Sequence, residues 1–216
     1  MSLERRAAAH AALGDAKRLL IVDHLMTGDR TVAELADVSG MPGNLLAHHL
    51  EVLESAGLLE RRVSEGDHRR KYVSLRRHDL PPGMGTPPPS VGEIAFLCTH
   101  NSARSQFAAA LWERVTDRQA SSAGTHPAPR VHPTAVRVAE EFGVDLSRAQ
   151  PKGYEALHEP DLVVTVCDRA REAELPPAAA HSHWSVPDPV PVGTVAAFRS
   201  AFGEIAQRMA HLVDRD

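Results

Sequence analysis

Cysteine, aromatic residues and long apolar runs are scarce in this chain of 216 residues, and each scarcity excludes a class of protein. Two cysteines are too few for a disulfide scaffold, and such a pair is more often catalytic or redox-active. Aromatic residues make up only 4% of the chain, which together with abundant alanine favours a helix-rich, soluble protein. No apolar run approaches the roughly 18 residues of a membrane span. Because no apolar signal core follows residues 1–6 either, we expect a cytoplasmic protein with no membrane partner.

Acidic and basic residues nearly balance, but the basic ones are unevenly placed. The formal net charge is −4, so we do not expect a binder of bulk polyanions. Within residues 61–77, however, basic side chains bunch together: Arg61, Arg62, Arg69, Arg70, Lys71, Arg76 and Arg77. Such a stripe is typical of phosphate contacts in nucleic-acid binding, although a solvated arginine-rich hairpin has the same composition.

Residues 1–80 have the pattern of a small helical domain followed by a β-hairpin. Thr31 and Glu34 have the spacing of a capping box, and Asn44 is suited to cap a later helix. Helical spacing of apolar residues predicts helices at 3–13, 16–26, 31–38 and 44–55, and β segments follow at 58–63 and 70–75. Helix, short turn, helix and basic hairpin together predict a winged helix-turn-helix.

This domain resembles the ArsR family of transcriptional repressors. The resemblance is carried by residues 12–21 (ALGDAKRLLI), 31–36 (TVAELA) and 49–59 (HLEVLESAGLL). It implies operator DNA as a partner, with the helix at 44–55 in the major groove, and a homodimer formed through residues 3–13. The implied DNA-binding residues are Asn44, Ala47 and His48 at the bases and Arg69, Arg70 and Lys71 on phosphates.

Two departures from the family pattern stand out. The start of the predicted recognition helix, residues 43–48, offers few of the donors that read base edges. The domain also has no cysteine, so it cannot hold arsenite through sulfur as arsenic-sensing members do. Its histidines lack a metal-ligand spacing with carboxylates, and we expect no metal site.

Residues 81–90 (PPGMGTPPPS) divide the chain. This segment cannot hold a helix and lacks the donors for the centre of a sheet, so it predicts a semi-extended linker. We therefore expect a DNA-binding domain at 1–80 and a second domain at 91–216.

The second domain alternates strand and helix patterns. Strands are predicted at 92–98, 119–123, 161–167 and 182–186, and helices at 104–116, 132–142 and 195–213. Such units imply a small four-stranded parallel sheet covered on both faces. The loop after the first strand then lies at the carboxyl edge of the sheet, where such folds bind ligands.

That loop, residues 98–105 (CTHNSARS), is the most informative segment of the chain. A cysteine at a strand end, five residues, then Arg104 at a helix start predict an oxyanion cradle with a nucleophile at its base. Loop N–H groups would hold the anion, and Arg104 would clamp two of its oxygens. The same positive field favours the thiolate of Cys98; the alternative is a buried structural cysteine. The predicted oxyanion-binding residues are Thr99, His100, Asn101, Ser102, Ala103, Arg104 and Ser105.

Residues 92–213 resemble the low-molecular-weight protein tyrosine phosphatase superfamily and, within it, the arsenate reductases built on that fold. Besides the loop, the resemblance is carried by residues 120–125 (ASSAGT), 161–168 (DLVVTVCD) and 183–189 (HWSVPDP). The fold class implied for the whole chain is α/β with two domains, a winged helix-turn-helix and a phosphatase-type parallel sheet.

The resemblance also implies the chemistry. Arsenate or a phosphate-like oxyanion is the expected substrate, attacked by Cys98, with Asp188 as general acid. Ser102 and Ser105 would donate to the Cys98 sulfur, and Asn101 would hold the shape of the loop. No bound cofactor is implied, but an external thiol reductant is, such as thioredoxin, mycothiol or mycoredoxin. Asp188 has the alternative of a turn residue, because prolines flank it.

Cys167 ends the third predicted strand and should lie at the same sheet edge as Cys98. A second thiol can attack an arsenylated Cys98, which releases arsenite and leaves a disulfide. No third cysteine follows Cys167, and Ala103 stands where such loops often have one. Either a Cys98–Cys167 disulfide forms and an external dithiol reduces it, or a small thiol attacks the adduct directly. Cys167 as a buried strand cysteine is the third possibility.

Three functions therefore stay open. The first is an arsenate reductase joined to a DNA-binding regulator of its own operon. The second is a transcription factor whose Cys98 domain senses an oxyanion or an oxidant without turnover, and the third is a small phosphatase. Asp188 is followed by Pro-Val-Pro and not by the tyrosine-rich segment of tyrosine phosphatases, which counts against the third.

Overall fold

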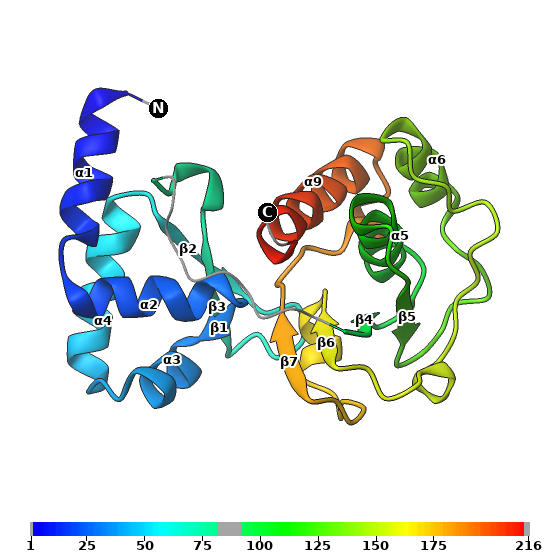
Figure 1. Ribbon diagram of the computed structural model, residues 1–216, viewed down its shortest axis with the longest axis horizontal. Coiled ribbons are helices and arrows are strands. Elements are labelled where there is room, and N and C mark those ends of the chain that lie inside the picture. Colours follow the sequence, from blue (N-terminus) through cyan, green and yellow to red (C-terminus); the bar gives the residue numbers. More distant parts are fainter. Residues whose placement is uncertain (1, 82–91, 214–216) are drawn as a thin grey trace. The chain divides into compact units, whose positions relative to one another are not determined.

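The computed structural model describes residues 2–81 and 92–213, and they form two compact units (Figure 1). The predicted linker at 81–90 lies outside the described residues, apart from Pro81. None of the helices in the described ranges is long and apolar enough to cross a membrane.

The first unit has four helices and a small antiparallel sheet. The helices are α1 (Leu3–Leu13), α2 (Ala16–Met26), α3 (Val32–Ser39) and α4 (Gly43–Ser55). The strands are β1 (Arg30–Thr31), β2 (Leu59–Val63) and β3 (Lys71–Leu75), in the order β1-β3-β2. A short 3-10 helix, η1 (Arg77–Asp79), follows them. The predicted winged helix-turn-helix is confirmed, and β1 is an additional strand that the sequence did not indicate.

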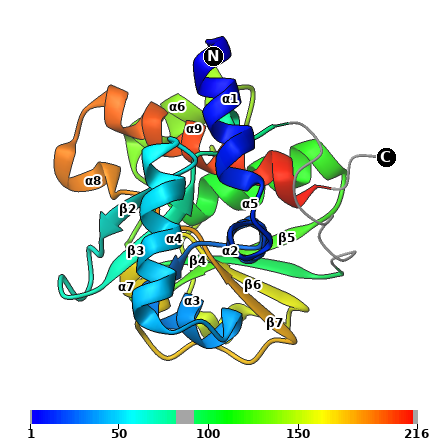
Figure 2. The same ribbon diagram turned by 90° about the vertical axis from the view of Figure 1, so that its left-hand side faces the viewer.

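Local capping fixes where the helices of the first unit begin. Asp15 accepts from the backbone N–H groups of residues 17 and 18, and Thr31 and Glu34 form the predicted capping box. The prediction that Asn44 caps α4 is wrong. The helix begins at Gly43, with Pro42 at the cap position and no side-chain cap, and the Pro42 carbonyl accepts from Leu46 N–H. Gly40, at φ +64°, makes the turn between α3 and α4 that Figure 2 shows.

The core of the first unit is built from the apolar stripes of its helices. Side chains with no measurable exposure include Ile21 and Leu25 of α2, Leu35 of α3, and Leu46 and Leu50 of α4. Each such side chain stabilises the fold by about 1.5–3 kcal/mol relative to an exposed one. The helix-turn-helix is thus held as one body by its own apolar residues.

The second unit is a four-stranded parallel sheet with the order β5-β4-β6-β7. Its strands are β4 (Ile94–Cys98), β5 (Ala120–Gly124), β6 (Leu162–Thr165) and β7 (Ala180–His183). Its helices are α5 (Arg104–Thr116), α6 (Pro133–Glu141), α7 (Asp168–Arg171), α8 (Pro189–Val192) and α9 (Val195–Leu212). The predicted fold class is confirmed, but the last two strands are shorter or earlier than predicted, and the one-turn helices α7 and α8 were not foreseen.

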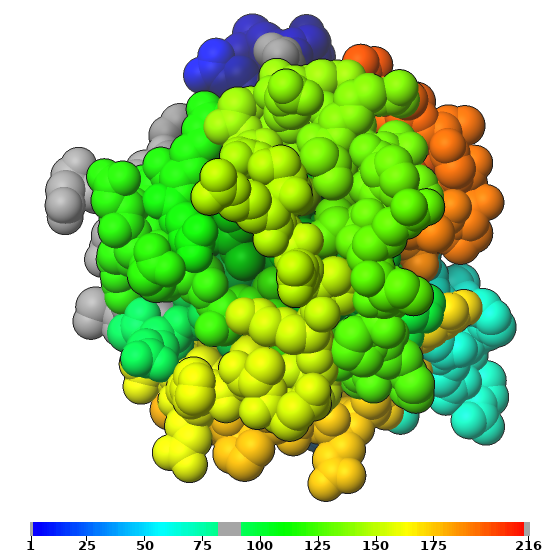
Figure 3. Space-filling model, turned by 90° about the vertical axis from the view of Figure 1, so that its right-hand side faces the viewer, coloured from blue at the N-terminus to red at the C-terminus, as the bar shows by residue number. Residues whose placement is uncertain are grey.

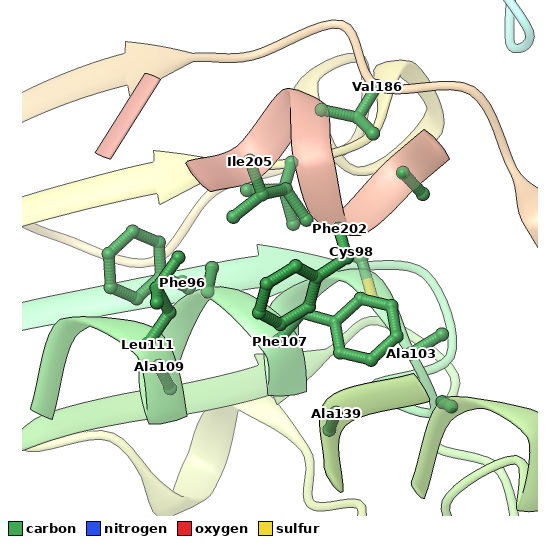
Figure 4. Close-up of a cluster of buried hydrophobic side chains, with 14 of the residues drawn as sticks. Phe96, Cys98, Ala103, Phe107, Ala109, Leu111, Ala139, Val186, Phe202 and Ile205 are labelled. Atoms are coloured by element: carbon green, nitrogen blue, oxygen red, sulfur yellow. The ribbon is translucent and has the colours of Figure 1, made fainter. Parts of the chain in front are cut away.

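The two faces of this sheet are covered differently. Helices α5, α6 and α9 bury one face, where the rings of Phe107 and Phe202 meet edge to face at 5.2 Å (Figure 4). The cluster of buried apolar side chains on the other face is smaller, and the 3-10 helix η2 (Tyr154–Ala156) packs against it. Cys98 is the last residue of β4 and belongs to the buried cluster beneath α5, α6 and α9.

Candidate active site

The loop after β4 is folded so that its carbonyl groups all point outward to other donors. Backbone N–H groups at 125, 126, 128 and 132 donate to the carbonyls of residues 98, 99, 100 and 102, at 2.8–3.3 Å. Gln106 Nε2 donates to the Asn101 carbonyl, and Phe107 N–H to that of Ala103. With its acceptors turned outward, the loop keeps its N–H groups for the inside, which is the arrangement that binds anions.

Asn101 is the residue around which the loop turns. Its φ of +48° lies in the left-handed region, which costs energy for any residue other than glycine. Its side chain offsets that cost with three hydrogen bonds. Nδ2 donates to Ser105 Oγ at 2.8 Å, and Oδ1 accepts from Gln106 Nε2 at 3.0 Å and from Lys152 N–H at 2.9 Å. Asn101 therefore holds the loop closed.

The Cys98 sulfur receives hydrogen bonds from two of these groups. The Ser105 hydroxyl lies 3.0 Å from it, and because Ser105 Oγ accepts from Asn101, its own proton is available for the sulfur. Asn101 N–H donates to the sulfur at 3.1 Å. Ser102, also predicted to donate, contributes its carbonyl to the loop's outer contacts instead. A sulfur surrounded by donors is suited to act as a thiolate nucleophile.

Arg104 and Asp188 face each other at the mouth of the loop. Arg104 Nη2 lies 3.0 Å from Asp188 Oδ2, and Nη1 donates to the Val186 carbonyl at 2.8 Å. Burial lowers the pKa of Arg104, but the groups that face it, Asp188 as carboxylate and Cys167 and Cys98 in their thiolate forms, together outweigh burial and raise the pKa, so the guanidinium stays charged. Asp188 also caps α8, where Val190 N–H donates to Oδ1. Asp188 is thus a capping residue of this turn, and its role as general acid stays a prediction.

Cys167 lies beside the loop. Its sulfur is 3.4 Å from Thr99 Oγ1, the residue next to Cys98. In the parallel register Leu97 pairs with Thr165, so both cysteines lie at the same sheet edge. Burial raises the pKa of Cys167 to about 11, and the Arg104 charge opposes this. Cys167 is therefore a protonated thiol at neutral pH.

Three residues of the site carried no obvious sequence signal. Gln106 and the backbone of Lys152 bind Asn101, and Gly124 packs against the loop so closely that a Cβ would lie 2.7 Å from the Thr99 carbonyl oxygen. Only the turn Ala-Gly-Thr hinted at Gly124. Among the described residues, no group of three or more His, Cys, Asp or Glu side chains could hold a metal ion.

The predicted DNA-binding residues all lie in α4 or the β2–β3 hairpin. Asn44 and His48 are exposed on α4 and Ala47 is half-buried. Arg69 and Arg70 are exposed between the strands, and Lys71 is the exposed first residue of β3.

The basic stripe is narrower than the sequence indicates. Arg77 is buried and donates to the carbonyls of Leu25 and Met26 at the end of α2. Arg61 pairs with Glu54, and Arg62 and Arg76 pair with Glu60. Side chains that cap a helix or neutralise a carboxylate contribute less to a positive surface, so these four arginines add little to the basic stripe.

Comparison with known proteins identifies both units. Residues 93–215 match the family model of the low molecular weight phosphotyrosine protein phosphatases, and residues 15–61 match that of the bacterial regulatory proteins of the arsR family. The chain belongs to the low-molecular-weight phosphatase family and carries an ArsR-family helix-turn-helix in front of that domain. Figure 3 shows one face of the phosphatase-like unit.

The curated relatives of the second unit include arsenate reductases. Arsenate reductase 2 of Staphylococcus epidermidis is 36% identical over 101 residues, which cover 44% of this chain and 77% of the relative. The arsenate reductase of Halalkalibacterium halodurans is 36% identical over 129 residues, 54% of this chain and 91% of the relative. A solved arsenate reductase in the phosphate-binding state is 28% identical, with a TM-score of 0.50, over 56% of this chain and 95% of that one.

Proposed function

We propose that the second unit reduces arsenate to arsenite through Cys98 and Cys167, and that the first unit binds operator DNA. The observation that carries the reductase proposal is the 3.4 Å contact between the Cys167 sulfur and Thr99 of the cradle. A phosphatase needs one thiol and water, whereas a second thiol at the cradle suits reduction. The named relatives, which are arsenate reductases, support the same choice.

The first step uses the cradle. Loop N–H groups and Arg104 bind the arsenate oxygens, and the Cys98 thiolate attacks arsenic. One arsenate oxygen leaves as water, with a proton from the Asp188 carboxyl, and a sulfur–arsenic bond remains. Anion binding must first draw Arg104 away from its contact with Asp188.

The second step uses Cys167. Its sulfur attacks the Cys98 sulfur, a sulfur–sulfur bond forms and the sulfur–arsenic bond breaks. The electron pair of that bond stays on arsenic, which passes from As(V) to As(III) and departs as arsenite with the Cys167 proton on oxygen. The two thiols are oxidised to a disulfide, which an external dithiol such as thioredoxin or mycoredoxin reduces.

A single turnover tests this proposal. Fully reduced protein is mixed with arsenate and no added thiol, and arsenite and free thiols are counted. We expect one arsenite per chain with two thiols lost. If arsenite appears only when a small thiol is added, that thiol attacks the Cys98–arsenic adduct directly and Cys167 is not needed. No arsenite in either case, with Cys98-dependent hydrolysis of an aryl phosphate, would make the unit a phosphatase; neither activity would leave an oxyanion or oxidant sensor.

The DNA proposal rests on the ArsR-type match and on the exposed residues of α4 and the hairpin. A gel shift on the DNA upstream of the coding sequence should show a complex that weakens steeply with salt. No shift even at low salt would overturn it.

A further inference from the structure

A buried carboxylate–imidazole pair lies directly after the second cysteine. Asp168 follows Cys167, and its Oδ1 is 3.1 Å from Nε2 of His183 on β7. The two side chains are 2% and 1% exposed. Neither residue takes part in the reaction proposed above. Burying polar groups costs free energy, and that reaction does not account for this buried pair.

The pair is anchored to the sheet through His183. His183 Nδ1 lies 2.8 Å from Thr165 Oγ1 and 3.2 Å from the Thr165 carbonyl oxygen, and Thr165 Oγ1 donates to the Ser182 carbonyl. Burial raises the pKa of Asp168, but its hydrogen bonds, the largest of them with His183, together outweigh burial and lower the pKa, so the carboxylate stays charged. The imidazole thus joins Asp168 to the strand pair β6–β7, which is part of the rigid sheet.

Such an anchor matters because α7 is too short to fix itself. It has four residues, and one helical turn is not stable on its own. Cys167 is its cap: Ala170 N–H faces the Cys167 sulfur at 3.4 Å, and Arg171 N–H donates to the Cys167 carbonyl. The direction of the sulfur therefore depends on whatever holds the first residue of the turn, which is Asp168.

We infer that Asp168 and His183 are positioning residues for Cys167: they hold the start of α7 to the sheet so that the Cys167 thiol faces the cradle and the Cys98–Cys167 disulfide forms rapidly. The inference rests on the proposed function, in which that disulfide is the second step. Neither side chain touches the oxyanion or the reacting sulfurs. Their removal should therefore slow the second step and leave anion binding at Cys98 unchanged.

The test is a mutant cycle in the full-length protein: Asp168→Ala, His183→Ala and the double variant. The rate of disulfide formation is measured twice, once with arsenate and once with diamide, a thiol oxidant that does not need the cradle's chemistry. Anion binding is measured by the protection that inorganic phosphate gives Cys98 against alkylation. His181→Ala is the matched control, because His181 lies two residues earlier on β7 and is exposed.

We expect both disulfide rates to fall about tenfold or more in each single variant, a loss typical of small displacements of a reacting group. The double variant should be no slower than the singles, because the pair acts as one unit. Phosphate protection and the His181→Ala rates should match the wild type. Unchanged disulfide rates would overturn the inference, as would a parallel loss of phosphate protection, which marks general damage to the fold.

Two further arms keep the outcome decisive. If an alanine variant lacks the near-ultraviolet circular dichroism of the wild type, Asp168→Asn and His183→Gln replace it, and each should retain part of the rate because a hydrogen bond remains possible. If the wild type forms the disulfide with diamide but releases no arsenite, the proposed function fails. The diamide rates then still decide the positioning role, so the two failures are distinguishable.

Discussion

The two thiols differ because their surroundings differ. Cys98 receives hydrogen bonds from Ser105 and Asn101, whereas burial keeps Cys167 protonated at neutral pH. This division suits a reaction in which Cys98 attacks first and Cys167 only after an adduct has formed.

Replacing each cysteine should separate the two steps. Cys98→Ser should abolish arsenite formation, because a hydroxyl is a far weaker nucleophile than a thiolate. Cys167→Ser should abolish thiol-free turnover but keep phosphate protection of Cys98 from alkylation. Thiol counts and mass spectrometry after one turnover provide the measurement. Thiol-free arsenite release by Cys167→Ser would remove Cys167 from the reaction.

The second step should accelerate with pH. Because burial raises the pKa of Cys167 to about 11, the thiolate fraction rises about tenfold per pH unit below that value. The diamide-driven rate of disulfide formation, measured between about pH 7 and 9, should follow this slope. Cys98 alkylation in the same buffers serves as the reference. A rate that levels off below about pH 8 would contradict a buried, protonated Cys167.

At the scale of elements, the cradle depends on its neighbours. The loop after β4 is held by the chain after β5, whose N–H groups bind its carbonyls, and by residues 150–152, which bind Asn101 and Gln106. This close approach is possible because β5 ends in Gly124, which pairs with Cys98 in the parallel register.

Gly124→Ala should damage the cradle. The added Cβ would lie 2.7 Å from the Thr99 carbonyl oxygen and 2.9 Å from Asn101 N, both backbone atoms that cannot turn aside. We expect a loss of about 1–3 kcal/mol in the free energy of unfolding and weaker phosphate protection of Cys98. Denaturant unfolding and alkylation measure the two effects. Gly203→Ala, within α9 and with open space around it, is the control and should be neutral or stabilising.

The hairpin should contribute to DNA binding through few side chains. Lys71→Ala should reduce the slope of log affinity against log salt by about one, as expected for one phosphate contact. Arg61→Ala is the matched control, because Arg61 already pairs with Glu54 at 3.1 Å and should change the slope less. Titrations of operator DNA at several salt concentrations measure both. Equal slopes for the two variants would place the phosphate contacts elsewhere.

At the scale of the whole molecule, α1 leaves an apolar stripe exposed. Leu3, Ala7 and Ala11, spaced four residues apart, are exposed, whereas Ala9, Ala12 and Leu13 face the core. Such a stripe on the helix at 3–13 is consistent with the predicted homodimer.

Charge placed on that stripe should dissociate the dimer. Ala7→Glu introduces a carboxylate, and burying that charge in the dimer interface would cost free energy. Light scattering should therefore report a monomer for the variant and a dimer for the wild type. Arg6→Glu, a charge change at an adjacent position, should weaken the dimer less. A monomeric wild type at all concentrations would refute the prediction.

The features that could be predicted from the sequence are those set by residues close together in the chain. The apolar stripes, the Thr31–Glu34 capping box and the order strand, Cys98 loop, helix depend on residues a few positions apart, so spacing was enough to predict most of the helices and strands and the place of the Cys98 loop. The tertiary structure decided what depends on distant segments. The parallel register brings Cys167 beside Thr99 and Gly124 beside Cys98. Arg77 is buried against the end of α2 and is not part of the basic stripe. Strand β7 provides His183, the partner of Asp168. These contacts follow from how the sheet pairs and packs, and no local spacing records that.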